Sequence, residues 1–262
     1  MSSLIRAEQS GACLRVVLDH PERRNALSPD LLEALRDALR AIPDDVRVVV
    51  LTGTGTVFSV GGDLQLRATG KGLLTGDADE SRARLGRAVE IVPLLAALPQ
   101  VTVAAINGAC AGAGLSLAAA CDLRIATAKA RFNTAFLTAG VSGDFGGIRA
   151  VTRLIGPARA RELFLLPGPF PASRAAELGL VTRVAGDAEY GSAVQGIIDS
   201  LLGVAPLALR AMKANLVDAE TGSLEEYLAA ECERYVQTGR SSDSIEAAAA
   251  YLEKRTPVFR GQ

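Results

Sequence analysis

The sequence predicts an α/β fold with much parallel strand pairing, followed by a layer of helices. Strand-like and helix-like segments alternate from the N-terminal region to Ile106, a rhythm typical of parallel sheets with covering helices. The segment Val46–Thr52 is a nearly continuous β-branched run, as expected for a strand buried on both faces. With 262 residues, the chain can bury a sizeable core as one large domain, or as one domain with an appendage.

The elements of the first half carry clear local signals. Ser28 and Pro29 open a helix that should continue to about Ala41, because serine at the N-cap followed by proline favours a helix start. A second helix over residues 81–97 should end before Pro99. Strands are expected at residues 12–19, 46–52 and 101–106.

The second half changes character after Gly146 and is predicted to be almost entirely helical. One brief strand is expected near Val181–Val184. Helices are expected at residues 146–155, 157–166, 171–178, 188–203, 205–219, 223–238 and 241–254. In the first half, residues 67–80 are rich in glycine and polar side chains, and we expect them to be mobile.

Composition narrows the classes of function. Apolar residues make up 49% of the chain and charged residues 22%, with a net charge of −1. This balance is that of an ordinary globular protein and gives no electrostatic reason to expect nucleic acid or a membrane as partner. The N-terminal residues MSSLIRAEQS lack the basic and apolar regions of a signal peptide. We therefore expect a cytoplasmic protein.

The cysteine and histidine content limits the chemistry. The four cysteines are scattered without CxxC spacing, which suits reduced and mostly buried thiols. His20 is the single histidine, so a zinc site or a Ser–His–Asp triad is not expected. We expect no metal, and any acid–base chemistry must then use carboxylates. The cysteines are Cys13, Cys110, Cys121 and Cys232.

The stretch VTVAAINGACAGAGLSLAAACDLRIA, from Val101 to Ala126, combines a strand, a glycine-spaced turn, a helix of small residues and a second strand. A helix that starts in such a turn offers free backbone N–H groups and the positive end of its dipole. We therefore place the reaction centre around Ala113. Asn107 and Asp122 divide the run into pieces too short for a membrane span. Leu117 stands where a dinucleotide loop needs its third glycine.

Five motifs occur in an order that resembles the crotonase superfamily, the enoyl-CoA hydratases and isomerases. The similarity covers nearly the whole chain and includes its ending, AAAAYLEKRTPVFRG. The motifs are RRNAL (23–27), VFSVGGDL (57–64), AAINGACAGAGLSLAAACDLRIA (104–126), GVSGDFGG (140–147) and AAELGLVTRV (175–184).

The resemblance implies an α/β fold of the ClpP/crotonase type, a spiral of ββα units followed by a helical region. Residues 1–200 would form the core that carries the acyl-CoA site. Residues 201–262 would form a C-terminal helical trimerisation region, in a homotrimer or a dimer of trimers. Coenzyme A would enter as part of the substrate, so no separate cofactor is expected.

The resemblance also implies that two backbone N–H groups bind the thioester oxygen of an acyl-CoA. They fall on Gly62 and Ala113. Paired donors at these positions would stabilise the negative charge of an enolate where it develops, and small residues would let the thioester approach the backbone. The Gly61–Asp63 segment can also be a tight turn in which Asp63 caps the next helix.

Contacts to coenzyme A are implied at Arg24 and Ala26 of the RRNAL loop. Lys254 or Phe259 is placed toward the adenine end. Further acyl-CoA contacts fall on Val60, Gly61, Asp63, Leu64, Gly112, Ser116, Phe136 and Gly140.

The chain departs from the two-carboxylate hydratases of this superfamily. The positions of their two glutamates hold Ser116 and Phe136, and neither side chain can act as a carboxylate base. One acid remains in the right segment, Asp144, at a position that resembles the one used by phenylacetate-pathway isomerases and dienoyl-CoA isomerases. A single carboxylate can remove a proton from one carbon and return it to another. Asp144 could instead cap the helix that begins near Gly146.

An isomerase that moves an enoyl-CoA double bond is therefore the first hypothesis. Asp144 would be the catalytic acid–base, and apolar Phe136 nearby would raise the pKa of its carboxyl. Ser116 would line the pocket, or bond back to a carbonyl of its own helix. The alternatives are a hydratase-like lyase that uses Asp144 alone, and a non-catalytic acyl-CoA-binding protein. A dehalogenase is less compatible, because that branch also needs a histidine and His20 lies in the first loop.

Overall fold

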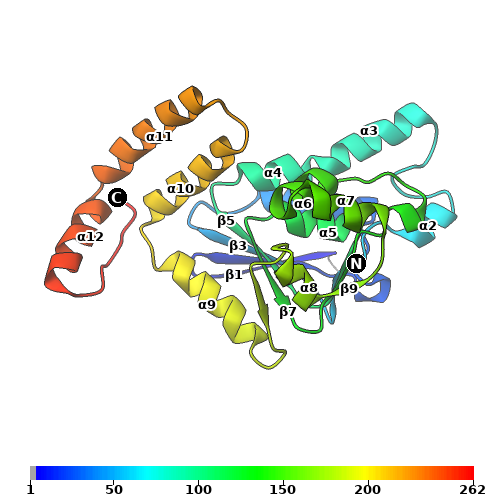
Figure 1. The fold of residues 1–262 in the computed structure, drawn as a ribbon, viewed down its shortest axis with the longest axis horizontal. Coiled ribbons are helices and arrows are strands. Elements are labelled where there is room, and N and C mark those ends of the chain that lie inside the picture. Colours follow the sequence, from blue (N-terminus) through cyan, green and yellow to red (C-terminus); the bar gives the residue numbers. More distant parts are fainter. Residues whose placement is uncertain (1–3) are drawn as a thin grey trace. The chain divides into compact units, whose positions relative to one another are not determined.

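The computed structural model describes residues 4–262 and divides into two compact units. The first unit comprises the chain up to Leu98 together with Thr102–Val194. The second comprises Pro99–Val101 and Gln195–Gln262. The predicted α/β class is confirmed in the first unit, where a largely parallel sheet is covered by helices (Figure 1).

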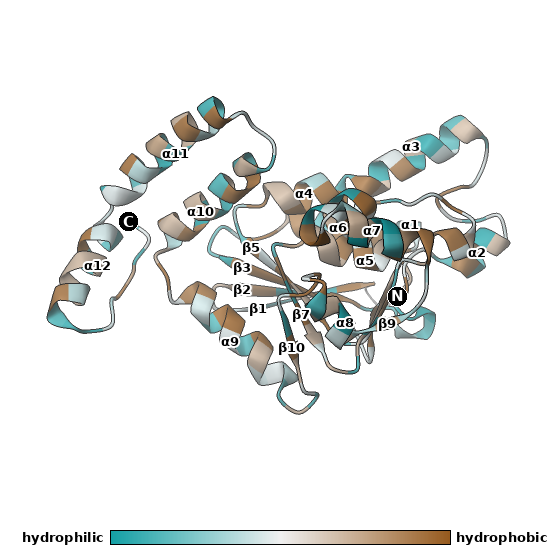
Figure 2. Ribbon diagram, in the orientation of Figure 1, coloured by the Kyte–Doolittle hydropathy of each residue, from teal (hydrophilic) through white to brown (hydrophobic). Residues whose placement is uncertain are grey.

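The main sheet has six strands in the order β1-β2-β3-β5-β7-β10. The β1–β2 pair is antiparallel, whereas β2–β3, β5–β7 and β7–β10 are parallel. All six residues of β3 are buried, as its β-branched run predicted, and hydrophobic residues follow the central strands in Figure 2. The strands are β1 (Ile5–Ser10), β2 (Cys13–Leu18), β3 (Val48–Gly53), β5 (Val101–Ile106), β7 (Leu123–Thr127) and β10 (Arg183–Ala185).

The prediction missed β1, and the reason lies in its exposure. Only Ile5 of this strand is buried, and the next five residues are exposed. An edge strand of this kind shows no alternation of apolar and polar residues, which is the usual signal for a strand. The strand forms because its backbone pairs with β2 along its whole length.

A second sheet of four short strands carries the loops of the site. Its order is β4-β6-β8-β9, with β4–β6 and β6–β8 parallel. These strands have two or three residues each, too few to produce a visible period, and β6, β8 and β9 were not predicted. They are β4 (Val57–Ser59), β6 (Ala109–Ala111), β8 (Arg131–Asn133) and β9 (Phe170–Pro171).

Most helix starts follow the predicted caps. The Ser28 hydroxyl accepts a hydrogen bond from the Leu31 amide at 3.2 Å, and the four leucines of α1 that face the sheet are buried. The Asp63 carboxylate likewise caps α2 by accepting from the Leu66 amide at 2.9 Å. The helices of the first unit are α1 (Pro29–Arg40), α2 (Leu64–Ala68), α3 (Ala78–Val89), α4 (Ile91–Ala97), α5 (Ala113–Ala120), α6 (Gly147–Ile155), α7 (Pro157–Leu165) and α8 (Ala172–Glu177).

The single helix predicted over residues 81–97 is wrong, because the structure has two helices there. The break lies between Val89 and Ile91. Pro93, the third residue of α4, has no amide hydrogen, and its ring conflicts with a helical carbonyl four residues earlier, at Val89. The proline therefore explains the position of the break. Within the stretch expected to be mobile, α2 ends at Ala68 and α3 begins at Ala78.

Two helical glycines should respond in opposite ways to alanine. A side-chain carbon on Gly114 of α5 would lie 2.7 Å from the Ser59 carbonyl oxygen, whereas one on Gly86 of α3 meets nothing within 4 Å. We expect Gly114→Ala to lower the free energy of unfolding by about 1–3 kcal/mol through overpacking. Gly86→Ala should raise it by about 0.5–1 kcal/mol. Urea denaturation of both variants measures this, and equal effects would contradict the close approach of α5 to β4.

The second unit is helical, and every predicted helix in the C-terminal region is present within two residues of its expected bounds. Its helices are α9 (Tyr190–Leu202), which begins in the first unit, α10 (Pro206–Ala219), α11 (Leu224–Gly239) and α12 (Ser242–Glu253). The buried Lys213 ammonium donates to the Gln100 carbonyl at 2.7 Å, and this bond joins α10 to the Pro99–Val101 segment of the same unit.

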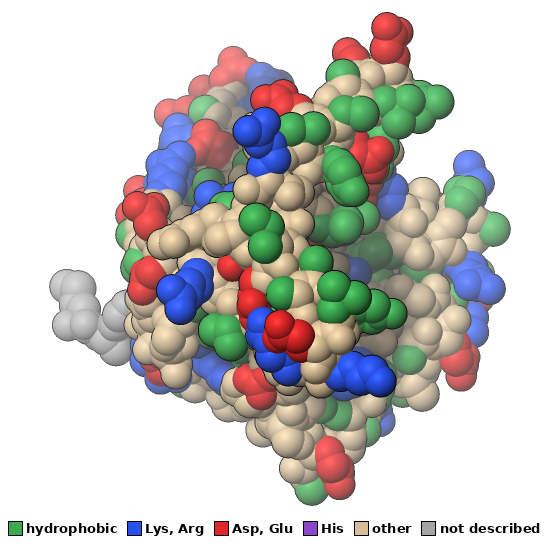
Figure 3. All heavy atoms as spheres, turned by 90° about the vertical axis from the view of Figure 1, so that its left-hand side faces the viewer, with side chains coloured by type: hydrophobic (Ala, Val, Ile, Leu, Met, Phe, Trp, Pro, Cys, Tyr) green, Lys and Arg blue, Asp and Glu red, His purple; other side chains and the backbone are tan. Residues whose placement is uncertain are grey.

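Apolar side chains remain on the surface of the second unit. They include Met212, Leu216, Tyr235, Val236, Tyr251 and Leu252, each more than half exposed. Hydrophobic side chains between charged ones are visible in the space-filling view (Figure 3). Within residues 4–262, no single helix has both the length and the hydropathy of a membrane span. The helices α9 and α10 have that length and hydropathy only when they are taken together, and the chain bends by 103° between them.

Candidate active site

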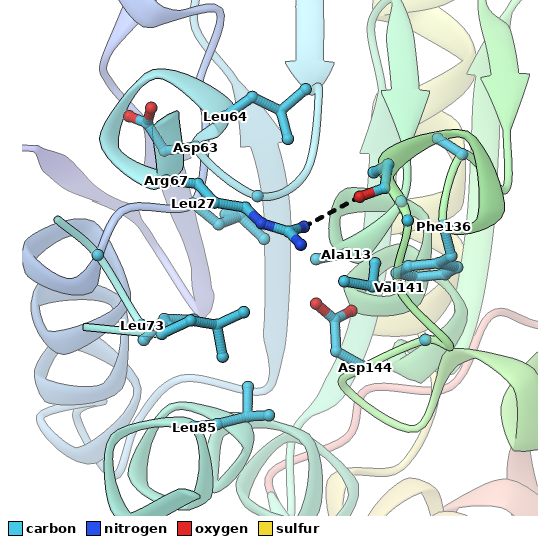
Figure 4. A pocket seen from close by; sticks show the side chains of 18 of the residues that line it. Leu27, Asp63, Leu64, Arg67, Leu73, Leu85, Ala113, Phe136, Val141 and Asp144 are labelled. Carbon is cyan, nitrogen blue, oxygen red and sulfur yellow. Dashed lines mark hydrogen bonds between the residues drawn. The ribbon is translucent and has the colours of Figure 1, made fainter. Parts of the chain in front are cut away.

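The first unit contains a cavity of about 600 Å³, within the range of small-molecule binding sites. The loop after β4, helix α2 and the residues up to Leu74 form one wall. The start of α5 and the loop from Ala135 to Asp144 form the opposite wall. Leu73 and Leu85 on one side face Val141 and Phe136 on the other (Figure 4). The cavity therefore combines apolar walls with a few polar groups.

Two backbone amides without protein partners lie at this cavity. Among the described residues, neither the Gly62 nor the Ala113 N–H donates a hydrogen bond to a protein acceptor, and both residues line the cavity. Ala113 is the first residue of α5, where a helix leaves its N–H groups unpaired and carries its partial positive charge. The structure thus brings together the two amides that the sequence singled out.

The close approach of these two loops depends on Gly61. Its φ is +86°, a conformation that L side chains rarely adopt. A side-chain carbon on Gly61 would lie 2.6 Å from the Ala111 carbonyl oxygen and 3.0 Å from the Ala113 nitrogen. A larger residue would therefore push the β4 loop away from the start of α5. Gly61 supports the site through its backbone and does not line the cavity.

Asn25 and Ser59 hold the loop before Gly62 in place. The buried Asn25 side chain donates to the Thr54 and Val57 carbonyls at 3.1 and 2.8 Å. The Ser59 hydroxyl donates to the Asn25 carbonyl at 2.7 Å and accepts from the Gly61 amide at 3.1 Å. The RRNAL motif therefore acts first as an anchor, a role that the sequence analysis did not assign to Asn25.

Asp144 brings a carboxyl group to the same cavity. Its Oδ1 is buried and has no hydrogen-bond partner among residues 4–262. Burial raises the pKa of the Asp144 carboxyl from 3.8 to about 6. A pKa near neutrality allows a carboxylate to take up and release a proton during a reaction. Figure 4 shows the carboxyl pointing into the cavity toward the side where Ala113 and Phe136 lie.

The loop around Asp144 is strained, and it does not use the carboxylate as a helix cap. Phe145 is a buried residue with φ +47°, between Gly143 at +123° and Gly146 at +64°. Such conformations persist only where the surroundings enforce them, and they are common at functional sites. The N-cap of α6 is Gly146, without a side-chain hydrogen bond. The capping alternative for Asp144 is therefore wrong.

Phe136 occupies one of the two glutamate positions and gives the cavity an apolar wall. The residue is 6% exposed, and its ring stacks on Phe164 with ring centroids 6.2 Å apart. An aromatic wall withholds water from nearby charge and favours the neutral form of a carboxyl. The Phe136 ring thus helps to keep water away from the Asp144 carboxyl.

Ser116, at the other glutamate position, was predicted to line the cavity, but it does not. It is 1% exposed, and its hydroxyl donates to the carbonyls of Gly112 at 3.4 Å and Asp144 at 3.3 Å. A side-chain carbon on Gly147 would lie 2.0 Å from the Ser116 oxygen, so the start of α6 covers this face of α5. The alternative prediction, a hydrogen bond from Ser116 back to a carbonyl of its own helix, is confirmed by the bond to Gly112. The other carbonyl that Ser116 contacts is that of Asp144.

The other sequence-predicted positions divide into two groups. Arg24 is exposed, Ala26 is buried, and neither lines the cavity. Lys254 and Phe259 lie in the second unit. The predicted residues that the structure does bring together around the cavity are Val60, Gly62, Asp63, Leu64, Gly112, Ala113, Phe136, Gly140 and Asp144.

Several lining residues were missed by the sequence analysis. Arg67, Lys71 and Leu73 come from the glycine-rich stretch, Leu85 from helix α3, and Val141 from the opposite wall. Those residues follow no helical or strand period, so only the fold reveals that they face one space. Among residues 4–262, no group of three His, Cys, Asp or Glu side chains is arranged to hold a metal ion.

The fold is similar to that of several solved structures. An enoyl-CoA hydratase from Bacillus anthracis superposes with a TM-score of 0.91 at 30% identity, over 99% of this chain and 100% of the other. A putative enoyl-CoA hydratase from Thermobifida fusca YX in complex with CoA gives 0.82 at 30% identity, over 96% and 95% of the two chains. The chain therefore has the crotonase fold that its motifs implied.

The sequence comparisons then define the family. The enoyl-CoA hydratase/isomerase family matches residues 8–262, and the chain belongs to it. A probable enoyl-CoA hydratase, echA6, of Mycobacterium leprae is 35% identical over 98% of this chain and 100% of its own. The 1,2-epoxyphenylacetyl-CoA isomerase of Escherichia coli K12 is 33% identical over 100% of both chains. Hydratases and isomerases thus both occur among the relatives.

Proposed function

We propose that this enzyme of the enoyl-CoA hydratase/isomerase family isomerises the double bond of an enoyl-CoA thioester. The observation that carries the proposal is the unpaired Asp144 carboxyl in a cavity shared with the free amides of Gly62 and Ala113. Relatives crystallised with CoA and with acetoacetyl-CoA support a thioester as ligand, and an isomerase among the relatives supports the reaction.

The two amides would bind the thioester oxygen. Removal of a proton next to the thioester carbonyl places negative charge on that oxygen, and donors already fixed in place stabilise it without reorganisation. Gly62 is fixed by the Asn25–Ser59 bonds, and Ala113 by its position at the start of α5. Both donors are part of the backbone, so their positions do not depend on a side-chain rotamer.

Asp144 would move the proton. Its carboxylate takes a proton from the α-carbon of a 3-enoyl-CoA, and the electron pair of that C–H bond delocalises into the thioester and the double bond. The protonated Asp144 then returns the proton to the γ-carbon, which leaves the double bond between the α- and β-carbons. No water is consumed and no second acid is needed, in keeping with Ser116 and Phe136 at the two glutamate positions.

The test compares two substrates with two proteins. Wild type and Asp144→Asn are each incubated with a 3-enoyl-CoA and a 2-enoyl-CoA, and the products are separated by liquid chromatography. Isomerisation of the 3-enoyl-CoA by wild type and its loss in Asp144→Asn support the proposal. Hydration of the 2-enoyl-CoA would instead support a lyase that uses Asp144 alone. Binding of both substrates without turnover would indicate a non-catalytic acyl-CoA-binding protein.

We further propose that the second unit mediates assembly into a homotrimer or a dimer of trimers. Exposed apolar side chains lie on each of α10, α11 and α12, and apolar surface that gathers in patches marks protein contacts. Sedimentation equilibrium should give a mass of three or six times the chain mass of 27.2 kDa. A chain that stays monomeric at micromolar concentration would contradict this assembly.

A further inference from the structure

Two basic side chains project from an otherwise largely apolar wall of the cavity. Arg67 belongs to α2 and Lys71 follows that helix, and both line the cavity together with Leu64, Leu73 and Leu85. Among residues 4–262, neither basic group forms an ion pair with a carboxylate. Their charges therefore remain available to a ligand.

Arg67 is held across the cavity. Its Nη1 donates to the Ala139 carbonyl on the opposite wall at 3.1 Å, the bond drawn as a dashed line in Figure 4. A guanidinium has five N–H donors, and this bond uses one of them. The figure shows the group pointing into the cavity, toward the wall on which Ala113 and Asp144 lie. The remaining donors are therefore available to a ligand in the cavity.

The acidic residues of the cavity do not neutralise these two charges. Asp63 and Asp144 are the acids among the lining residues. The Asp63 carboxylate is already paired with Arg23 and with the Leu66 amide. No ion pair joins Asp144 to Arg67 in the part of the chain that the structure describes. Because Arg23 neutralises Asp63, the charges of Arg67 and Lys71 exceed that of an ionised Asp144 by one. A largely apolar cavity with this surplus of positive charge suits an apolar chain that bears an anionic group.

We propose that the cavity selects acyl-CoA thioesters whose acyl group ends in a carboxylate, with Arg67 as the residue that binds this carboxylate. The planar guanidinium matches a carboxylate by two parallel hydrogen bonds, and Lys71 adds attraction as a second positive charge. The leucines of the same wall contact the methylene groups between the carboxylate and the thioester. This inference rests on the proposed function in one respect, the placement of the thioester at Gly62 and Ala113.

An anion could also come from the phosphate groups of coenzyme A, so the test separates the two sources. Dissociation constants are measured by calorimetry for free CoA and for two pairs of saturated thioesters of equal chain length. The pairs are pentanoyl-CoA with glutaryl-CoA and octanoyl-CoA with suberyl-CoA. Saturated thioesters have no double bond to isomerise, and therefore the measurement does not depend on catalysis.

We expect wild type to bind the carboxylate-terminated member of at least one pair about tenfold or more tightly. Arg67→Met keeps an unbranched apolar stem but removes the charged guanidinium, and it should abolish this preference while the affinity for free CoA stays the same. Arg67→Lys should retain part of the preference. Arg82→Met is the matched control, because Arg82 is an exposed arginine of α3 that pairs with Asp79 outside the cavity.

Three results would overturn the inference. Wild type could prefer the methyl-terminated member of both pairs, or the preference could persist in Arg67→Met. An equal loss of affinity for CoA and all thioesters in Arg67→Met would assign Arg67 to the phosphates. A failure of the proposed function looks different: no thioester would bind to any protein, or the thioesters would bind with the expected preference while 3-enoyl-CoA is not isomerised.

Discussion

Asp144→Asn should lower kcat for isomerisation by about 10²–10⁴-fold with little change in KM. General acid–base catalysis contributes a factor of that size, and asparagine keeps the shape of the side chain but cannot accept and return the proton. In wild type, kcat/KM should rise with pH and level off above a pH of about 6, where the carboxyl is ionised. Initial rates from pH 4.5 to 8.5 measure this dependence, which should be absent from the residual activity of the variant.

The same substitution should stabilise the fold. Because the pKa of Asp144 is raised from 3.8 to about 6 in the folded chain, the folded state binds more protons than the unfolded state in this interval. The free energy of unfolding therefore falls as the pH rises through it. Above a pH of about 6, Asp144→Asn should exceed wild type by about 1–2 kcal/mol, after allowance for the partly exposed side chain.

A control separates the two effects of Asp144→Asn from general consequences of charge removal. Asp79→Asn removes an exposed carboxylate of α3 that pairs only at the surface with Arg82, so it should alter neither the isomerisation rate nor the unfolding free energy by a large amount. A variant Asp144→Asn that is both active and less stable than wild type would show that the carboxylate has a structural role.

Ala113→Pro should lower kcat/KM by about 10²–10³-fold with little loss of stability. Ala113 is the first residue of α5, where proline is compatible with a helix because the N–H has no partner within the helix. The substitution deletes the proposed oxyanion donor and fills its place with a ring carbon, and loss of one such donor has an effect of this size. Steady-state kinetics together with thermal unfolding by circular dichroism measures both consequences.

The matched control for this substitution is Ala78→Pro. Ala78 is the first residue of α3 and is exposed. The carboxylate of the N-cap residue Asp77 accepts hydrogen bonds from the amides of Asp79 and Glu80 and not from that of Ala78. This variant should retain wild-type kinetics and stability. Full activity in Ala113→Pro would mean that the amide of Ala113 does not bind the thioester oxygen.

Local signals in the sequence predicted most helices well and most short strands poorly. Ser28 and Pro29 mark the start of α1 because a cap acts over three or four residues. The strands of the second sheet contain only two or three residues, and they exist because neighbouring strands supply their hydrogen bonds. Pairing between distant segments leaves no period in the sequence of either one.

The site was predictable where backbone geometry requires particular residues. Gly61 is needed for its positive φ and for the close approach of Ala111, and such a requirement is visible in a sequence as a glycine between strand and helix. Arg67 and Leu85 could not be found in this way, because only the fold brings their side chains to one cavity. Ser116 was misplaced because helix α6, which covers it, is distant in the sequence.

The second unit joins two segments that lie far apart in the sequence, and this determines when the unit can form during synthesis. Pro99–Val101 leave the ribosome long before Gln195–Gln262, with which they form one compact unit. Lys213 must reach the Gln100 carbonyl across 113 residues of chain, and closing so long a loop has a larger entropic cost than forming a local helix contact. The second unit therefore matures only after the C-terminal helices have emerged, and a nascent chain that stops before Lys213 leaves the Gln100 carbonyl without this bond.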